Sequence, residues 1–186
     1  MRAARGLAEE VERTQLVYKG ACIQVLNKTV RLPDGRRARR DVVTYEGGAV
    51  CIVAITKDDG VILVRQYRPA PEKVTVEIPA GRKGHGESSL AAARRELREE
   101  TGFTAASWKR GICFWPSPGF VDEKLTLYIA SGLREGSPET DADEFIKVLV
   151  VPLADALQQC LTGAIDDAKT LIGLLWYAAS RVTATP

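Results

Sequence analysis

The segment GRKGHGESSLAAARRELREETGF, residues 81–103, decides how the middle of the chain folds. Ser88 precedes a run of Ala, Leu, Arg and Glu, which all favour helices, and serine is a good N-cap. Gly102 follows the run, and glycine commonly ends a helix because it adopts the left-handed conformation without strain. The pattern therefore predicts a helix over residues 88–100, preceded by a loop that starts at Pro79-Ala80-Gly81.

Three carboxylates share one face of this helix. At 100° per residue, Glu96, Glu99 and Glu100 fall within an arc of about 100°, beside an apolar stripe that contains Leu97. Arg95 lies four residues before Glu99 and is placed to pair with it. Adjacent carboxylates repel one another, so the folded helix needs counter-charges. Arginine on a solvated face is one solution, and a divalent cation such as Mg²⁺ or Mn²⁺, which prefers oxygen ligands, is another.

The composition argues against several classes of protein. Lys and Arg number 26 against 24 Asp and Glu, so the net charge of +2 gives no general attraction to nucleic acid or to an anionic membrane. The five arginines within residues 31–41 form a short patch without interleaved aromatic residues, which does not indicate RNA binding. We see neither an apolar run long enough to span a bilayer nor the apolar core of a secretory signal.

The cysteines and the histidine give a similar result. His85 is the only histidine, which makes a histidine-rich zinc site impossible. The four cysteines are widely spaced and form no CxxC pair, so we interpret them as small buried hydrophobic residues. Free thiols are typical of a reducing compartment, and we therefore expect a cytoplasmic protein.

Alternating and β-branched runs predict strands on both sides of the helix. Residues 17–30 and 36–46 are expected to form two strands that flank the turn 32–35, after a polar lead-in at 1–14 that is helical or frayed. Further strands are predicted over 49–56, 61–67, 74–78, 107–114, 124–131 and 146–151, and closing helices over 152–161 and 166–180. We expect an α+β domain at residues 47–186, with mixed β-sheets sandwiched between α-helices, and an N-terminal β-hairpin extension at residues 1–46.

The segment 81–103 also matches a known pattern, GX5EX7REUXEEXGU, at every defined position. Gly81, Glu87 and Arg95 begin its three parts, and the run from Glu96 to Phe103 completes it. Such a match is far more specific than a lone GxGxxG. The chain therefore resembles the Nudix hydrolases, and the resemblance implies a Nudix fold in which this box forms a loop, a helix and a second loop.

Further segments resemble one branch of that family, the ADP-ribose pyrophosphatases. They are LVRQYR at 63–68, EIPAG at 77–81 and SPGF at 117–120, with Pro118 fifteen residues after Phe103. The similarity covers approximately residues 15–180. The related GDP-sugar pyrophosphatases carry a similar Ser-Pro-Gly segment, so the branch is less specific than the family.

The resemblance implies a metal site on the box. The backbone carbonyl of Ala80 and the side chains of Glu96 and Glu100 would bind Mg²⁺ or Mn²⁺, with Glu99 as a third ligand or a support. Arg95 would orient the glutamates. Three residues would have structural roles in the motif: Gly81, Glu87 and Gly102.

The resemblance also implies substrate contacts. Arg68 and Glu123 match positions that contact substrate in this branch, and Ser117, Pro118 and Gly119 form the substrate loop. Each also has a simpler interpretation. Arg68 would be a surface charge at the end of a strand, Glu123 a solvated loop acid, and Ser117-Pro118-Gly119 an ordinary turn. Proteins of this branch are homodimers whose N-terminal strands cross to the partner, which would bring Arg40 of one chain near the substrate of the other.

The general base is expected in the acidic loop 137–145. The box glutamates would be engaged by metal, so another carboxylate would polarise the attacking water. Glu144 lies two residues before the strand that starts at Ile146, and the resembled branch has a glutamate at about this spacing. Glu139, Asp141 and Asp143 are alternatives, and a merely solvated acidic loop is a fourth.

The sequence therefore predicts a cytoplasmic, Mg²⁺-dependent (or Mn²⁺-dependent) Nudix diphosphatase that hydrolyses ADP-ribose to AMP and ribose 5-phosphate. One alternative is a pyrophosphatase for GDP-mannose or another nucleoside diphosphate sugar. Another alternative is a catalytically silent Nudix domain that senses a nucleotide. The expected partners are a small-molecule substrate and a second copy of the chain through the N-terminal strands, with no nucleic acid and no membrane.

Overall fold

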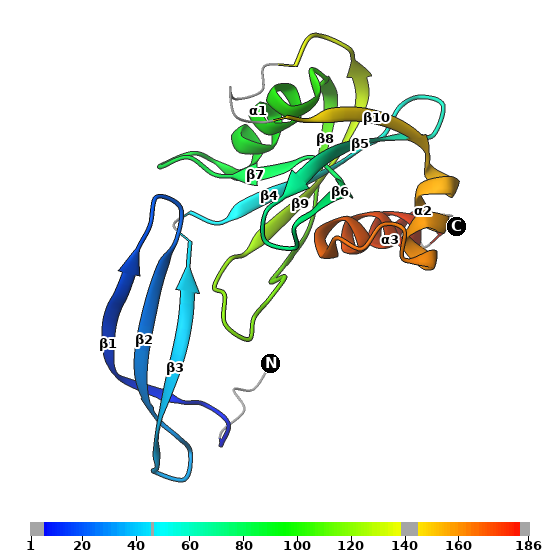
Figure 1. Ribbon diagram of the computed structural model, residues 1–186. Helices are drawn as coiled ribbons and strands as arrows, with labels where there is room; N and C mark the ends of the chain where they lie inside the picture. Colours follow the sequence, from blue (N-terminus) through cyan, green and yellow to red (C-terminus); the bar gives the residue numbers. More distant parts are fainter. Residues whose placement is uncertain (1–5, 46, 139–144, 183–186) are drawn as a thin grey trace.

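The computed structural model describes residues 6–45, 47–138 and 145–182. The described elements form three sheets and three helices (Figure 1). The strands are β1 (Glu10–Lys19), β2 (Gln24–Arg31), β3 (Arg37–Thr44), β4 (Ala49–Ala54), β5 (Gly60–Arg68), β6 (Lys73–Glu77), β7 (Ala80–Arg82), β8 (Thr104–Phe114), β9 (Leu125–Arg134) and β10 (Lys147–Pro152). The helices are α1 (Ser89–Thr101), α2 (Leu153–Thr162) and α3 (Ala168–Val182).

The core is built around β4, whose six residues are all buried. In the four-stranded sheet β7-β4-β9-β8, β4 pairs parallel with β9 and antiparallel with β7. Alternate side chains of a strand point to opposite faces. Val50, Ile52 and Ala54 accordingly pack in one cluster with α1, and Cys51 and Val53 pack in a second cluster with α2 and α3. The sheets therefore lie between helices, as the sequence predicts.

The predicted box helix is confirmed, with both of its caps. The Ser88 hydroxyl accepts a hydrogen bond from the Ala91 N–H at 3.2 Å. Gly102 adopts φ 76°, and its N–H donates to the Arg98 carbonyl at 2.8 Å. A Cβ at position 102 would lie 2.5 Å from the Gly136 carbonyl oxygen, so this cap requires glycine for space as well as for its backbone angle.

The N-terminal region differs from the expected hairpin. Residues 10–19 form a third strand, β1, so the extension is a three-stranded antiparallel sheet in the order β1-β2-β3. The prediction of a helical or frayed lead-in at 1–14 was therefore wrong over residues 10–14, and the single strand expected over 17–30 is divided between the end of β1 and β2. Glu12 is charged but still suits a strand, because it pairs with Arg31 of β2 and Arg37 of β3. Every residue of β1 is exposed.

Two smaller expectations also need correction. Ala80 belongs to a short strand, β7, and not to a loop, because it pairs with Cys51 of β4. All four cysteines are free, but Cys22 and Cys113 are exposed, so only two are buried hydrophobic residues. Across the described residues, no helix is both long enough and apolar enough to cross a membrane.

Candidate active site

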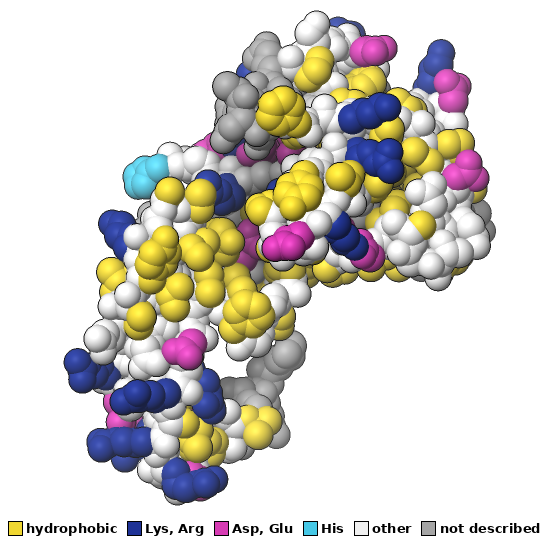
Figure 2. All heavy atoms as spheres, viewed as in Figure 1, with side chains coloured by type: hydrophobic (Ala, Val, Ile, Leu, Met, Phe, Trp, Pro, Cys, Tyr) yellow, Lys and Arg dark blue, Asp and Glu magenta, His cyan; other side chains and the backbone are white. Residues whose placement is uncertain are grey.

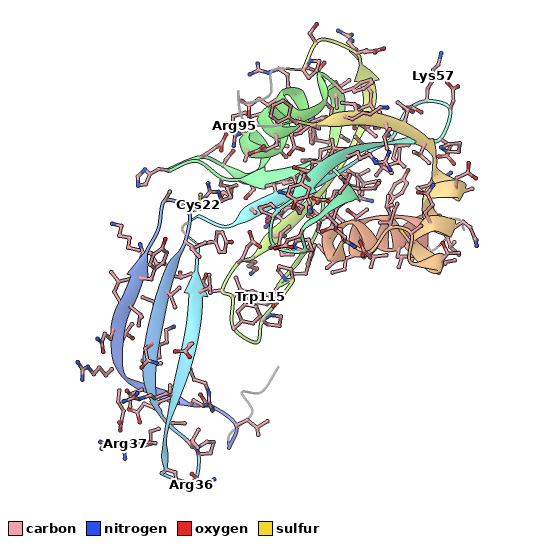
Figure 3. All side chains as sticks on the ribbon, in the orientation of Figure 1. Cys22, Arg36, Arg37, Lys57, Arg95 and Trp115 are labelled. Carbon is pink, nitrogen blue, oxygen red and sulfur yellow. The ribbon has the colours of Figure 1, made fainter. Side chains whose placement is uncertain are left out.

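Arg95 on α1 is the central cation of the box. Its guanidinium contacts Glu87 at 3.1 and 3.0 Å, Glu96 at 2.8 Å and Glu99 at 2.8 Å. It also donates to the backbone carbonyl of Arg82 at 2.9 Å. These contacts, above all those to Glu87, raise the pKa of Arg95, which therefore stays charged. Arg95 ties the loop before α1 to the acidic face of the helix (Figure 3).

Glu87 also stabilises the loop before α1. Its carboxylate accepts a hydrogen bond from the Gly84 N–H at 2.8 Å in addition to those from Arg95. Hydrogen bonds from Arg95 and Gly84 lower the pKa of Glu87. Glu87 is thus placed to hold the loop, while His85 within the same loop is exposed (Figure 2).

Gly81 makes room for Glu96. A Cβ at position 81 would lie 2.1 Å from the Cδ of Glu96 and 2.2 Å from both of its oxygens. Glu96 is only 9% exposed. Its carboxylate therefore lies against the backbone of β7, and any side chain at position 81 would displace it.

Glu100 lies beside the same short strand. It is 6% exposed, and its Oε2 accepts a hydrogen bond from the Ala80 N–H at 3.1 Å. Glu96, Glu100 and Ala80 therefore meet where α1 passes β7. Carboxylate and carbonyl oxygens are the donors that Mg²⁺ and Mn²⁺ prefer, so this donor set fits a hard divalent cation. Among the described residues, no three Asp, Glu, His or Cys side chains are already grouped as a cation site.

Arg68 at the end of β5 is held by a buried acid. Its Nε and Nη2 donate to the two carboxylate oxygens of Glu77 at 2.8 and 2.7 Å. These bonds raise the pKa of Arg68, and the charge of Glu100 acts in the same direction. Arg68 therefore lies in the electrostatic field of both Glu77 and the box helix. The sequence prediction missed Glu77, although an acid within the β-branched strand Lys73–Glu77 is a sign of a buried, paired carboxylate.

The loop with Ser117, Pro118 and Gly119 is attached to β3. Val43 donates through its N–H to the Phe120 carbonyl at 2.7 Å, and its own carbonyl accepts from the Asp122 N–H at 3.1 Å. An apolar groove of about 430 Å³ lies at this junction, lined by Val42, Trp115, Pro118, Gly119, Phe120, Val121 and Asp122. Trp115 is half exposed on the β8–β9 loop, with Lys124 Nζ 4.7 Å from its ring centre (Figure 3).

Glu123 follows this loop and is partly buried. Burial raises the pKa of Glu123, while the charges of Lys169 and Arg82 oppose that rise. Arg82 also donates to the Cys22 carbonyl at 3.3 Å, which links the β1–β2 turn to β7. Glu123 therefore lies within the electrostatic influence of Arg82 in β7 and Lys169 in α3.

The remaining predicted residues lie either away from the box or outside the described residues. Arg40 is on β3 and pairs with Glu9 in the N-terminal sheet, which stands apart from α1 in the same chain (Figure 1). Glu144 and its alternatives Glu139, Asp141 and Asp143 lie outside the described residues. The structure thus brings Ala80, Glu96 and Glu100 together, and leaves Arg40 on a separate sheet.

Comparison with known proteins supports one family. A NUDIX domain model matches residues 46–172. The chain is 38% identical over 168 residues to the ADP-ribose pyrophosphatase of Bacillus subtilis (strain 168), covering 89% of this chain and 90% of that protein. It is equally similar, at 38% with the same coverage, to the methanol dehydrogenase activator of Bacillus methanolicus. A GDP-mannose pyrophosphatase of Cronobacter sakazakii is 32% identical, covering 73% of this chain and 75% of that protein.

A solved structure shares the same fold. The crystal structure of an ADP compounds hydrolase matches with a TM-score of 0.86, covering 96% of this chain and 97% of that chain at 24% identity. The family match spans the box, both sheets of the body, α2 and the first residues of α3. This chain belongs to the Nudix hydrolase family, as its Gly81–Phe103 segment predicts.

Proposed function

We propose that this chain hydrolyses ADP-ribose to AMP and ribose 5-phosphate with the help of a divalent cation. Water adds to one phosphorus of the diphosphate, and the bridging P–O bond breaks. The observation that carries the proposal is the meeting of Glu96 and Glu100 with Ala80 beside β7, clamped by Arg95. Relatives named ADP-ribose pyrophosphatase at 35–38% identity support the choice of substrate.

The cation would be Mg²⁺ or Mn²⁺, held by the Ala80 carbonyl, Glu96 and Glu100, with Glu99 as a third ligand or support. When bound, it supplies positive charge that offsets the charge of the diphosphate. Arg95 orients the glutamates, because it contacts Glu96 and Glu99 directly. Gly81 and Gly102 keep the space that this arrangement needs.

Substrate contacts come from three places in this proposal. Arg68 offers a guanidinium to the diphosphate. The loop Ser117–Gly119 and Glu123 would supply the other contacts. Glu144 acts as the general base, since a carboxylate is suited to take a proton from the attacking water.

We also propose that the protein is a cytoplasmic homodimer. The N-terminal sheet presents large apolar side chains to solvent in one chain, among them Leu16, Val17 and Tyr18, which are 50–61% exposed. Contiguous exposed apolar side chains are typical of an interaction surface. A second copy placed against this sheet would bring Arg40 toward the partner's substrate.

A turnover screen tests the substrate. ADP-ribose, GDP-mannose, UDP-glucose, NADH and diadenosine polyphosphates are each supplied with Mg²⁺ and with Mn²⁺, and the products are identified. AMP and ribose 5-phosphate from ADP-ribose at the highest kcat/KM would support the proposal. Faster turnover of GDP-mannose would favour the alternative suggested by the GDP-mannose pyrophosphatase relatives. Tight ADP-ribose binding without turnover would instead indicate a nucleotide sensor.

A further inference from the structure

A buried carboxylate outside the box connects two distant elements. Glu77, at the end of β6, is 1% exposed. Both of its oxygens accept hydrogen bonds from Arg68 of β5, at 2.8 and 2.7 Å. Lys169 of α3 donates to it from the other side, and the Thr75 hydroxyl donates at 2.6 Å. The Glu77 carboxylate therefore accepts hydrogen bonds from residues of three elements, β5, β6 and α3.

The α3 end of this network is itself fixed. Asp167 accepts hydrogen bonds from the Lys169 ammonium and the Thr170 N–H at 3.0 Å each, and from the Thr170 hydroxyl at 2.6 Å. The Thr170 hydroxyl oxygen in turn accepts from the Ile78 N–H at 2.9 Å. The first turn of α3 thus holds the end of β6, three residues before Gly81 of the box.

The charges in the network strongly favour an ionised Glu77. Burial alone would raise the pKa of Glu77, but the hydrogen bonds from Arg68 and the positive charge of Lys169 outweigh it and lower the pKa to about 2. Charge-assisted bidentate pairs fix the plane of a guanidinium as well as its position. The Arg68 side chain is nevertheless 40% exposed, and its Nη1 makes no hydrogen bond within the described part of the chain.

We propose that Glu77, steadied by Lys169, is a positioning residue that fixes the Arg68 guanidinium for a nucleoside diphosphate ligand. Two nitrogens of Arg68 serve Glu77, and the third is left for an anionic oxygen. A fixed donor costs less entropy on binding than a freely rotating one. The inference rests on the proposed function only for the class of ligand, a nucleoside diphosphate sugar.

A double-mutant cycle tests this role. Wild type, Glu77→Gln, Arg68→Ala and the double variant are titrated with α,β-methylene ADP-ribose and Mg²⁺, and kcat and KM are measured for ADP-ribose. Glu77→Gln keeps the shape and removes the charge, so the Kd and the KM should each rise about tenfold, with kcat within about threefold. In the Arg68→Ala background the same change should cost less than about twofold, because Glu77 acts through Arg68.

Matched variants separate positioning from stability. Asp166→Asn breaks an exposed ion pair between Lys73 and Asp166, which joins the same two elements without touching Glu77, and should leave Kd and KM unchanged. Thr75→Val removes one donor to Glu77 but leaves its ion pairs with Arg68 and Lys169 intact, so it replaces Glu77→Gln in the cycle if that variant does not fold. It should raise Kd about threefold, and again only when Arg68 is present.

Two results would overturn the inference. Equal losses with and without Arg68 would show that Glu77 acts through folding alone, and tighter binding by Glu77→Gln would show that it competes with the ligand for Arg68. If the enzyme prefers GDP-mannose, the cycle is run with that substrate. The coupling between Glu77 and Arg68 can then be measured even if the substrate assignment is wrong. A protein that binds none of these nucleotides would refute both proposals.

Discussion

Two sheets of this molecule are built from opposite principles. In the body, β4 is buried throughout and packs against α1 on one face and against α2 and α3 on the other. In the N-terminal sheet, β1 is exposed throughout, and ion pairs such as Arg37–Glu12 cross its strands. Exposed ion pairs contribute only about 0–1 kcal/mol each, whereas a buried aliphatic side chain contributes about 1.5–3 kcal/mol. The body therefore has a core of its own, and the N-terminal sheet needs contacts beyond itself.

The structure shows some of those contacts within the chain. Val43 of β3 forms hydrogen bonds with the 115–122 loop, and Arg82 of β7 donates a hydrogen bond to Cys22 at the β1–β2 turn. Figure 2 shows hydrophobic side chains on the part of this sheet nearest the body, with Lys and Arg gathered at its far end. The N-terminal sheet thus contacts both the 115–122 loop and β7, and it exposes apolar side chains.

Removing the N-terminal sheet should have the largest effect. A chain that lacks residues 1–46 loses the contacts to the 115–122 loop and to β7 and, in our proposal, the dimer. We expect an insoluble or inactive product, measured by size-exclusion chromatography and ADP-ribose turnover. Deletion of residues 1–5 alone leaves β1 intact and is the control. A fully active, monomeric 47–186 chain would show that the body suffices.

Glu144→Gln tests whether the body supplies the base. Loss of a general base typically lowers kcat by about 10²–10⁴, and this variant should fall in that range. Mn²⁺ affinity, measured by titration, should change little, because Glu144 is not among the proposed ligands. An unchanged kcat, together with an inactive Asp143→Asn or Glu139→Gln variant, would assign the base to another acid of the loop.

Glu100→Gln tests the metal site on the box helix. The change keeps the shape of a side chain that is 6% exposed and removes its charge. Turnover should fall by about two powers of ten or more, and excess Mg²⁺ should restore only part of it. Asp155→Asn, an exposed acid on α2, is the control. Wild-type rates at low Mg²⁺ would mean that Glu100 is not a metal ligand.

Gly81→Ala tests the space for Glu96. The new Cβ would meet the Glu96 carboxylate at 2.1 Å, so the acid must move. Displacing a catalytic group by about 1 Å costs up to about 10²-fold, and we expect a 10- to 100-fold loss of kcat. Gly84→Ala is the matched control, because its Cβ would come no closer than 3.4 Å to Glu87. Equal activity in both variants would show that Glu96 is not held in place by this contact.

The features that the sequence predicts well are local ones. Ser88, the Ala- and Leu-rich run and Gly102 are neighbours along the chain, and their combined signal predicts α1 within a residue or two. The run at 49–54 is apolar throughout, so β4 is equally clear. The position of Arg95 four residues before Glu99 predicts an ion pair that the structure contains.

The features that sequence reasoning missed depend on distant partners. Glu77 and Lys169 are 92 residues apart, so no local pattern joins them. The segment Glu10–Lys19 is too charged to resemble a buried strand, and it forms an exposed strand only because it pairs with β2. The collision that excludes a side chain at Gly81 arises between a short strand and the facing helix, which spacing alone does not reveal.

Arg40→Gln should have the smallest effect and gives the sharpest test of the two-sheet comparison. Its pair with Glu9 is exposed, so the free energy of unfolding should change by less than about 1 kcal/mol. If Arg40 contacts the substrate bound to the other subunit, KM for ADP-ribose should still rise about 3- to 10-fold. Arg36→Gln is the control, since Arg36 pairs only with Asp34 in the same turn among the described residues.

Mixed dimers then decide which subunit Arg40 serves. A chain with Arg40→Gln is combined with a chain carrying Glu100→Gln, using two affinity tags. If Arg40 acts across the interface, the site with an intact Glu100 receives Arg40 from its partner, and about half of the wild-type activity should return with normal KM. If Arg40 acts within its own chain, that site keeps the raised KM, because the other site is disabled by Glu100→Gln. A raised KM in the mixed dimer would therefore show that Arg40 acts on the substrate bound to its own subunit.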